Sequence, residues 1–210
     1  MEKLVLIGAG GYSKSVIDSV DVFNYTIEGF IDEFSDNEEH LGFKILGKSL
    51  EDLDDCQKYV FFICIGNNER RKIWFDKLVK RNLRLINVVD KTAIVSPRAT
   101  IGNGCFIGKM AIVNSKAELG DDCIVNTKAL IEHGCKVKNH VNLSTNSVIN
   151  GDVVIDQGSF IGSCSVTIGQ LHIGEWSTVG AGAVVIENVE SNVIVAGVPA
   201  KVIRKGAMLG

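Results

Sequence analysis

Two different periods of apolar residues divide the chain near residue 90. In residues 1–90, short apolar runs alternate with polar segments whose apolar residues have helical spacing. The runs lie at 4–7, 26–32, 59–66 and 83–89, and the helical segments lie at 13–20 and 67–82. Strands separated by helices favour a small parallel sheet with right-handed crossovers. Residues 1–90 are therefore predicted to form a Rossmann-like α/β domain of the nucleotide-binding kind.

From Ala99 onward the apolar period is six. Stepping by six from Ile101 to Val185 meets an aliphatic residue at fourteen of fifteen positions, and Thr167 is the exception. Two residues before most of these positions stands a small side chain, Ala, Cys or Ser. Such a six-residue unit is typical of a parallel β-helix, in which three units close one triangular turn. Residues 91–210 are therefore predicted to form an all-β domain, with about five turns of parallel β-helix and a C-terminal tail.

Four segments together resemble one family of enzymes. They are GAGGYSKSVID after the first apolar run, FIDE after the second, FICIGNNERR around the third and AGVPAKVIR near the end. Over nearly the whole chain, their order and spacing resemble the NeuD/PglD-like sugar acetyltransferases of the hexapeptide-repeat acyltransferase superfamily. The resemblance implies a left-handed β-helix and the transfer of an acetyl group from acetyl-CoA to the amino group of a nucleotide-linked 4-amino sugar. We also expect a homotrimer, because flat prism faces pack about a threefold axis and place the active site between subunits.

Composition and charge restrict the expected cellular compartment and the expected binding partners. The net charge is −3 and no segment concentrates Lys and Arg, so neither nucleic acid nor a membrane is an expected partner. The apolar run Leu4 to Ile7 is too short for a signal peptide or a membrane span, which favours the cytoplasm. The six cysteines include no C-x-x-C pair and no zinc spacing, so no metal and no disulfide framework is expected. Cys105, Cys123 and Cys135 occupy the small inward position of the repeat, where they are expected to pack as apolar residues.

The glycine-rich turn after the first apolar run is a candidate phosphate site, because its backbone N–H groups can hold a pyrophosphate. Ser13 stands where the dinucleotide fingerprint has its third glycine, which favours a nucleotide-sugar over NAD. Asp32 is either an acceptor for ribose or uracil or an exposed loop acid. Asn68 is expected to combine binding with capping of the helix that follows. The candidate nucleotide-sugar site is Gly8, Gly10, Gly11, Tyr12, Asp32, Gly66, Asn67, Asn68 and Arg70.

His133 is the candidate catalytic residue. It lies two residues past the inward Ile131, where a corner of the prism directs a side chain outward, and on position alone it would be an exposed, noncatalytic histidine. The resemblance, in which IEH is followed two residues on by a cysteine, implies that it is the general base that accepts a proton from the sugar amine. The resemblance also gives Asn126 a role in positioning His133 or the substrate. His140 and His172 lie off the inward positions and are expected in solvent.

The resemblance further places the acetyl-CoA site in the last turns of the β-helix, where small residues let pantetheine approach the backbone. The corresponding positions are Asn142, Gly151, Gly162, Ser163, Gly180, Ala181, Gly182, Pro199 and Lys201. For any single glycine among them, a tight corner is an equally good explanation.

Three positions depart from the family pattern. The relatives carry an acid directly after the catalytic histidine, which orients its ring, but here that residue is Gly134. Asn142 replaces a second family histidine, and Tyr12 replaces a histidine of the glycine-rich turn. Glu132 precedes His133 and should point the other way in an extended chain. Because a neutral amine is already a good nucleophile, a weaker base favours N-acetylation over O-acetylation.

Three alternatives stay open. The first is O-acetylation of sialic acid or a similar sugar. The second is a noncatalytic nucleotide-sugar-binding module, which Gly134 would allow. The third is a zinc-dependent carbonic anhydrase of the same fold, which would need His133, His140 and His172 to converge on one metal although no register puts all three at matching corners.

Overall fold

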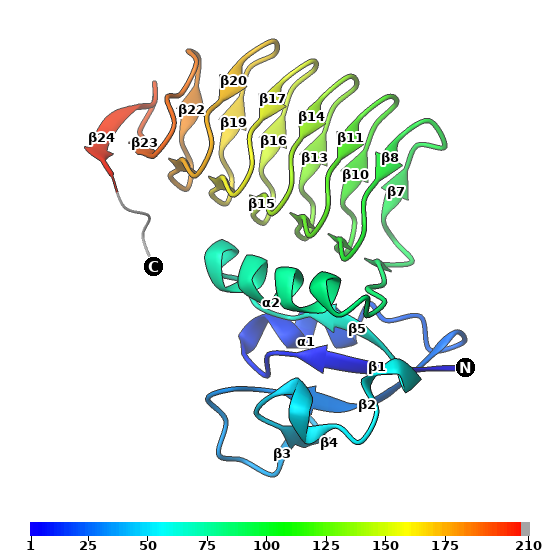
Figure 1. Cartoon of the computed structure of the whole chain (residues 1–210). Coiled ribbons are helices and arrows are strands. Elements are labelled where there is room, and N and C mark those ends of the chain that lie inside the picture. Colours follow the sequence, from blue (N-terminus) through cyan, green and yellow to red (C-terminus); the bar gives the residue numbers. More distant parts are fainter. Residues whose placement is uncertain (207–210) are drawn as a thin grey trace.

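A computed structural model describes residues 1–206, and it consists of a small α/β domain beside a long β-helix (Figure 1). The α/β domain has a five-stranded sheet in the order β3-β4-β2-β1-β5, parallel except for the β3–β4 hairpin. Its elements are β1 (Glu2–Ile7), α1 (Gly11–Ile17), β2 (Tyr25–Ile31), β3 (Glu39–His40), β4 (Phe43–Gly47), the 3-10 turns Leu50–Asp52 and Cys56–Lys58, β5 (Tyr59–Ile63) and α2 (Asn68–Lys80).

The two helices cover opposite faces of this sheet. Val16 of α1 packs against Leu4 and Leu6, whereas Trp74 and Leu78 of α2 belong to the cluster on the other face. Alternate side chains of one strand point to opposite faces, so a strand buried on both sides is continuously apolar, as β1 is from Leu4 to Ile7. The Rossmann-like prediction for this half is confirmed. Neither of the two helices in residues 1–206 has the length and apolarity to cross a membrane.

The β-helix has three faces, each a ladder of parallel two-residue strands. The domain face packs toward the α/β domain and contains β6 (Val88–Val89), β9 (Phe106–Ile107), β12 (Ile124–Val125), β15 (Asn142–Leu143), β18 (Phe160–Ile161) and β21 (Thr178–Val179). The aliphatic face contains β7 (Ile94–Val95), β10 (Ile112–Val113), β13 (Leu130–Ile131), β16 (Val148–Ile149), β19 (Val166–Thr167) and β22 (Val184–Val185). The polar face contains β8 (Thr100–Ile101), β11 (Glu118–Leu119), β14 (Lys136–Val137), β17 (Val154–Ile155) and β20 (His172–Ile173).

The six-residue pattern is confirmed by what lies inside the prism. From β7 to β22, the second residue of each strand points inward and packs with the small residues of the corners into one core cluster. Cys105, Cys123 and Cys135 are almost fully buried there, and burial raises the pKa of the Cys123 and Cys135 thiols, so both stay protonated. Beyond the last turn, β23 (Val193–Ala196) and β24 (Lys201–Lys205) extend the domain face as an antiparallel pair.

From Gly104 to Gly182, each corner of the prism turns through one residue of positive φ, at a spacing of six. Most of these residues are not glycine; Asp122, His140 and Asp152 are examples. An L residue with a side chain is strained in this region, so the turn persists because the surrounding backbone is hydrogen-bonded from coil to coil. The sequence gives little sign of this spacing, because no single residue type marks it.

In residues 1–90 one predicted strand is absent from the sheet, and strand β4 was not predicted. The run at 83–89 is not a strand of the α/β sheet: Leu85 makes only an isolated bridge to Phe61, and Val88–Val89 already pairs with β9 of the β-helix. The change of fold therefore begins at Val88. The segment between the runs at 26–32 and 59–66 contains an additional strand, β4, whose Phe43 and Ile45 pack on one face of the sheet and whose Leu46 packs on the other.

Candidate active site

A cavity of about 430 Å³ opens at the carboxyl ends of β1, β2 and β5. This is the edge at which open α/β sheets bind ligands. Of the nine residues predicted for the nucleotide-sugar site, eight line the cavity: Gly8, Gly10, Gly11, Tyr12, Asp32, Gly66, Asn67 and Arg70. The sequence-based set is thus brought together in space, with Asn68 as the exception.

The glycine-rich turn is built by close backbone contacts. Gly8 has φ +97°, and a Cβ at this position would lie 2.8 Å from Ile65 Cγ1 and 3.2 Å from the Cys64 carbonyl oxygen. Any side chain there would push the turn away from the loop after β5. Ser13, at the third fingerprint position, is fully buried and donates its hydroxyl to the Gly10 carbonyl at 2.7 Å. The turn is therefore closed by a side chain where a dinucleotide fingerprint has glycine.

Asp32 holds the loops around the cavity in place. Its Oδ2 accepts a hydrogen bond from Ala9 N at 2.6 Å, and its Oδ1 accepts from Phe34 N at 2.8 Å and from Ser35 N at 3.0 Å. The alternative of an exposed loop acid is wrong, because the side chain is partly buried between two loops. A carboxylate offers about four acceptor positions, so one of them remains for a ligand hydroxyl or amide.

An aromatic platform at the cavity mouth was not found from the sequence. The Phe34 ring is exposed, and the Arg70 guanidinium lies over it, 4.4 Å from the ring centroid. An exposed aromatic ring that lines a cavity is a surface on which a base can stack. The only signal for it in the sequence is an aromatic residue directly after FIDE.

Asn67, and not Asn68, caps α2. Asn67 Oδ1 accepts from Arg70 N at 2.9 Å, while Asn68 is buried and turns to the β-helix. Asn68 Nδ2 donates to the carbonyls of Gly158 and Ser159. The expected shared role of Asn68 was therefore wrong, because this side chain joins the two domains instead of lining the cavity.

A buried polar cluster fastens the cavity wall to the β-helix. The Arg71 side chain is 1% exposed, and its Nε lies 3.2 Å from Asp122 Oδ2. Its other nitrogens donate to the carbonyls of Ile65, Gly66 and His140. His140 Nδ1 lies 2.8 Å from the same Asp122 oxygen, and its side chain is 5% exposed. The expectation of a solvated His140 was wrong, because the domain junction buries this corner.

Two further residues complete the junction. Asn142 is buried on the domain face and donates its Nδ2 to the Gly66 carbonyl at 3.2 Å. Tyr12 meets the ring of Phe106 edge-on, with centroids 5.5 Å apart. Burial raises the pKa of the Tyr12 hydroxyl, which therefore stays neutral. Both residues that depart from the family histidines thus lie where the cavity meets the β-helix.

His133 lies at a different place, the corner between the aliphatic and polar faces. It follows β13 and its side chain is exposed. The ring rests on the next coil: a Cβ at Gly151 would lie 2.6 Å from His133 Cε1, 2.8 Å from Nε2 and 3.2 Å from Nδ1. The Glu132 carboxylate accepts from the backbone N–H of His133 at 3.3 Å. His133 is therefore supported by glycine backbone on one side and open to solvent on the other.

We predict that Gly151→Ala removes turnover by displacing the His133 ring. Because a Cβ at Gly151 would overlap the ring, we expect kcat to fall by ~10²-fold, as for a catalytic group misplaced by about 1 Å. The melting temperature should change little, because the ring is exposed. Steady-state kinetics in both substrates decide the cause. An increase confined to the KM for acetyl-CoA would contradict displacement and assign Gly151 to the donor site.

The remaining candidates gather at the corner between the domain and aliphatic faces. Asn126 lies there, and its Oδ1 accepts from Thr127 N at 2.8 Å. Gly162, Ser163, Gly180, Ala181 and Gly182 occupy the same corner in later turns. Ser163 Oγ lies 2.9 Å from Ser144 Oγ. Within one chain, these residues and His133 stand on opposite edges of the aliphatic face.

The tail residues lie at the end of the β-helix. Pro199 precedes Ala200, whose N–H donates to the Val184 carbonyl at 2.8 Å. Lys201 Nζ pairs with Glu187 at 3.3 Å in solvent. His172, on the polar face, lies 2.7 Å from Asp156 Oδ2 and is exposed, as predicted. Within residues 1–206, His133, His140 and His172 occupy three separate environments and do not form a metal site.

The structure thus combines a Rossmann-like sheet, with a cavity at its carboxyl edge, and a hexapeptide β-helix with an exposed histidine at one corner. These features define a two-domain hexapeptide-repeat protein. Residues 3–78 match the family model described as the PglD N-terminal domain. The acetyltransferase domain of PglB from Neisseria gonorrhoeae is 30% identical, with a TM-score of 0.92 over 97% of this chain and 100% of that one. The chain belongs to the PglD-like sugar acetyltransferases of the left-handed β-helix superfamily.

Two other relatives extend the comparison. A variant of perosamine N-acetyltransferase from Caulobacter crescentus, in complex with CoA and GDP-perosamine, is 28% identical, with a TM-score of 0.89 over 96% of this chain and 97% of that one. An uncharacterized protein of Acanthamoeba polyphaga mimivirus is 34% identical over 104 residues, which are 49% of this chain. The present chain covers 20% of the length of that viral protein.

Proposed function

We propose that the protein transfers the acetyl group of acetyl-CoA to the amino group of a nucleotide-linked amino sugar, with His133 as general base. One observation carries this proposal: the chain has both a nucleotide-sized cavity and an exposed histidine, in a fold of which one relative was solved with both substrates bound. The perosamine enzyme was solved with CoA and GDP-perosamine, and the PglB domain was solved with acetyl coenzyme A. N-acetylation is favoured over O-acetylation, because the relative that was solved with a sugar substrate is an N-acetyltransferase.

In the proposed reaction, the sugar nitrogen attacks the thioester carbonyl carbon. His133 accepts the proton that this nitrogen loses, and the C–S bond of the tetrahedral intermediate then breaks to release CoA. The developing oxyanion would be stabilised by backbone N–H groups at the glycine-rich corner that contains Gly162 and Gly180. No covalent enzyme intermediate is needed, which agrees with the three inward cysteines being buried thiols.

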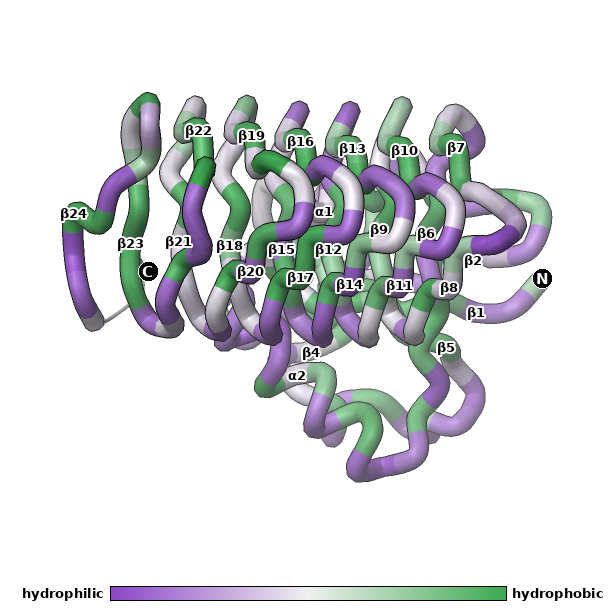
Figure 2. The backbone as a smooth tube through the Cα atoms, turned by 90° about the horizontal axis from the view of Figure 1, so that it is seen from above, coloured by the Kyte–Doolittle hydropathy of each residue, from purple (hydrophilic) through white to green (hydrophobic). Residues whose placement is uncertain are grey.

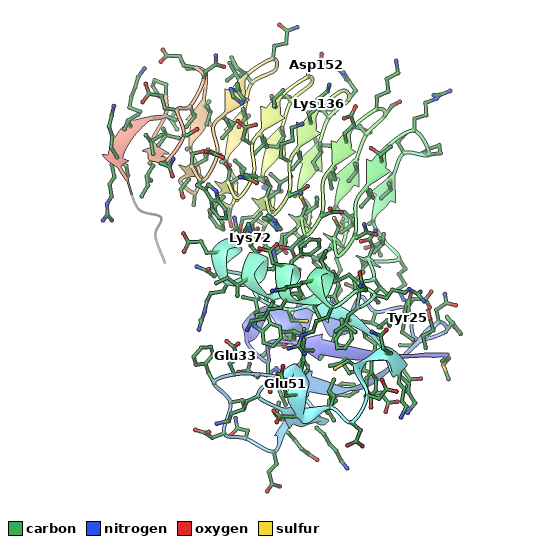
Figure 3. The ribbon with its side chains drawn as sticks, viewed as in Figure 1. Tyr25, Glu33, Glu51, Lys72, Lys136 and Asp152 are labelled. Carbon is green, nitrogen blue, oxygen red and sulfur yellow. The ribbon has the colours of Figure 1, made fainter. Side chains whose placement is uncertain are left out.

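We further propose that the active site forms between copies of the chain in a homotrimer. Figure 3 shows Asp152, beside the His133 corner, on the edge of the β-helix turned away from the α/β domain, whereas Glu33 of the cavity lies in that domain. One chain therefore cannot bring its own cavity to its own His133. The two edges of the aliphatic face carry the two halves of the proposed acetyl-transfer site, so packing this face against another copy would bring them together.

The aliphatic face has the chemistry that such packing requires. Its outward residues are Ile94, Ile112, Leu130, Val148, Val166 and Val184, and Figure 2 shows this row of strands as an apolar band. The outward residues of the polar face are Thr100, Glu118, Lys136, Val154 and His172. A continuous apolar strip on one side of a soluble fold marks an interface.

We predict that Val148→Asp separates the copies and removes turnover together. The substitution places a charge in the middle of the proposed interface, where it would have to be desolvated without a partner. Light scattering after gel filtration should show the monomer mass. Val154→Asp is the matched control, because Val154 has the same partial exposure on the polar face of the next strand. A trimer that persists in Val148→Asp, or is lost equally in the control, would contradict this assignment.

The reaction is tested by free-thiol release from acetyl-CoA with a panel of UDP-, GDP- and dTDP-linked 4-amino sugars. Each amino sugar is paired with the corresponding 4-hydroxy sugar. We expect release with one or more amino sugars and a product heavier by one acetyl group in mass spectrometry. Release with only the hydroxyl sugars would replace the proposal by O-acetylation. Binding of a nucleotide-sugar by calorimetry without any release would replace it by a noncatalytic binding module.

A further inference from the structure

We propose that Asp152, from the coil after His133, supplies the carboxylate that orients the His133 ring. The inference rests on the proposed role of His133 as general base. The residue directly after His133 is Gly134 and has no side chain with which to do this. An imidazole that acts as a base needs a partner at its second nitrogen to fix its tautomer and its orientation.

The space beside Gly134 is filled by the Asp152 carboxylate. Gly134 turns the corner with φ +68°, and a Cβ built on it would lie 2.1 Å from Asp152 Oδ1 and 3.2 Å from Asp152 Cγ. An acidic side chain at position 134 would therefore have no room, because the carboxylate of Asp152 from the next coil already occupies this space. The Asp152 carboxylate thus lies where a side chain of residue 134 would lie, although Asp152 comes eighteen residues later in the sequence.

The His133 ring and the Asp152 side chain each reach across the same junction between two coils. The ring lies on Gly151, and Gly151 directly precedes Asp152. The Asp152 N–H also donates to the His133 carbonyl at 2.9 Å, so the two backbones are joined at this point. One glycine on each coil makes room for the side chain of the other: Gly151 for His133, and Gly134 for Asp152.

No neighbouring group is bonded to the Asp152 carboxylate in the described residues. Within residues 1–206, the side chain of Asp152 has neither an ion pair with a cationic side chain within 4.0 Å nor a hydrogen bond to any other group. Lys136 comes from the adjacent strand of the polar face, and Figure 3 places it near Asp152 at this edge. The other nearby acid, Glu132, is bonded to the backbone of His133. The ring nitrogens of His133 themselves lie more than 4.0 Å from this carboxylate, so the proposed hydrogen bond forms when the exposed ring rotates about its side-chain bonds toward Asp152.

In this arrangement Asp152 is a positioning residue. It accepts the N–H of one ring nitrogen, so the other nitrogen carries the lone pair that takes the proton of the amine. When His133 becomes protonated during attack, the carboxylate also stabilises the imidazolium. The interaction links two successive coils of the β-helix. For this reason the acid is not next to His133 in the sequence, where Gly134 stands instead.

The test moves the carboxylate from one coil to the other. Asp152→Asn keeps the shape and the left-handed backbone but removes the charge, and we expect kcat to fall at least ~10-fold with both KM values little changed. Asp152→Gly and Gly134→Asp should each lose activity, the second because its Cβ meets the Asp152 carboxylate. The double variant Gly134→Asp/Asp152→Gly restores a carboxylate in the same gap, so it should recover most of the kcat lost in Asp152→Gly.

A second readout does not depend on turnover. The ¹⁵N chemical shifts of His133, assigned by comparison with His133→Ala, report which nitrogen carries the proton in the neutral ring. We expect one dominant tautomer in the native protein and a mixture in Asp152→Asn. An unchanged tautomer, an unchanged kcat in Asp152→Asn, or a double variant no better than Asp152→Gly would each overturn the inference. If the native protein shows no turnover with any sugar, the proposed function fails while the tautomer measurement still decides the role of Asp152.

Discussion

Replacing His133 by alanine should lower kcat/KM for the amino-sugar acceptor by at least ~10²-fold, the usual cost of removing a general base. The protein should fold as before, because the ring is exposed and lies against glycine backbone instead of filling a core. The loss should appear mainly in kcat, because the base acts on the nitrogen during attack and contributes little to binding either substrate.

The matched control for this prediction is His172→Ala. His172 is also an exposed histidine close to a carboxylate, 2.7 Å from Asp156, but it lies on the polar face in a later turn. Its removal should leave kcat within about twofold, as for a surface substitution. Full activity of His133→Ala would mean that the enzyme only positions an amine that is already nucleophilic. Equal losses in both variants would point to a general effect on the β-helix.

Arg71→Ala should destabilise the protein by about 3–5 kcal/mol, because it leaves the Asp122 charge buried without its partner. Six acceptors would lose a donor at once: the Asp122 carboxylate, the Asn68 amide oxygen and the carbonyls of Ile65, Gly66, Asp122 and His140. The first effect should be a weaker contact between α2, which forms a wall of the cavity, and the β-helix. Nucleotide-sugar affinity should therefore fall in parallel with the melting temperature.

The neighbouring residue provides the control for Arg71. Lys72 forms an exposed i,i+4 pair with Asp76, which is worth only about 0.3–0.5 kcal/mol, so Lys72→Ala should change stability within that range. The double variant Arg71→Met/Asp122→Asn removes both buried charges, keeps a residue that tolerates the positive φ of position 122, and should be more stable than Arg71→Ala alone. Urea unfolding followed by tryptophan fluorescence measures all four proteins, because Trp74 is buried on the same helix. If Arg71→Ala changed the free energy of unfolding by less than about 1 kcal/mol, the cluster would have to be accessible to water instead of buried.

The sequence alone indicates most of the cavity, because its residues sit at places that local rules identify. Gly8, Gly10 and Gly11 follow an apolar run, and Gly66 and Asn67 follow another. Parallel strands bring their carboxyl ends to one edge, so these segments had to meet. Local rules were insufficient for Asn68, which lies one residue past the cap and faces the other domain. They were also insufficient for Phe34, since an aromatic residue after a strand is as often exposed as functional.

What the sequence determined by itself is the pair of folds and the inward residues of the β-helix. A period of six, sustained from Ile101 to Val185, fixes which side chains point inward, because each strand alternates and each coil stacks on the last. Only the tertiary structure decided which residues meet across coils and domains. Asp152 reaches the gap beside Gly134 through stacking at a distance of eighteen residues, and Arg71 reaches Asp122 because one domain closes on the other. Such contacts depend on the geometry of packed coils, and no local pattern encodes them.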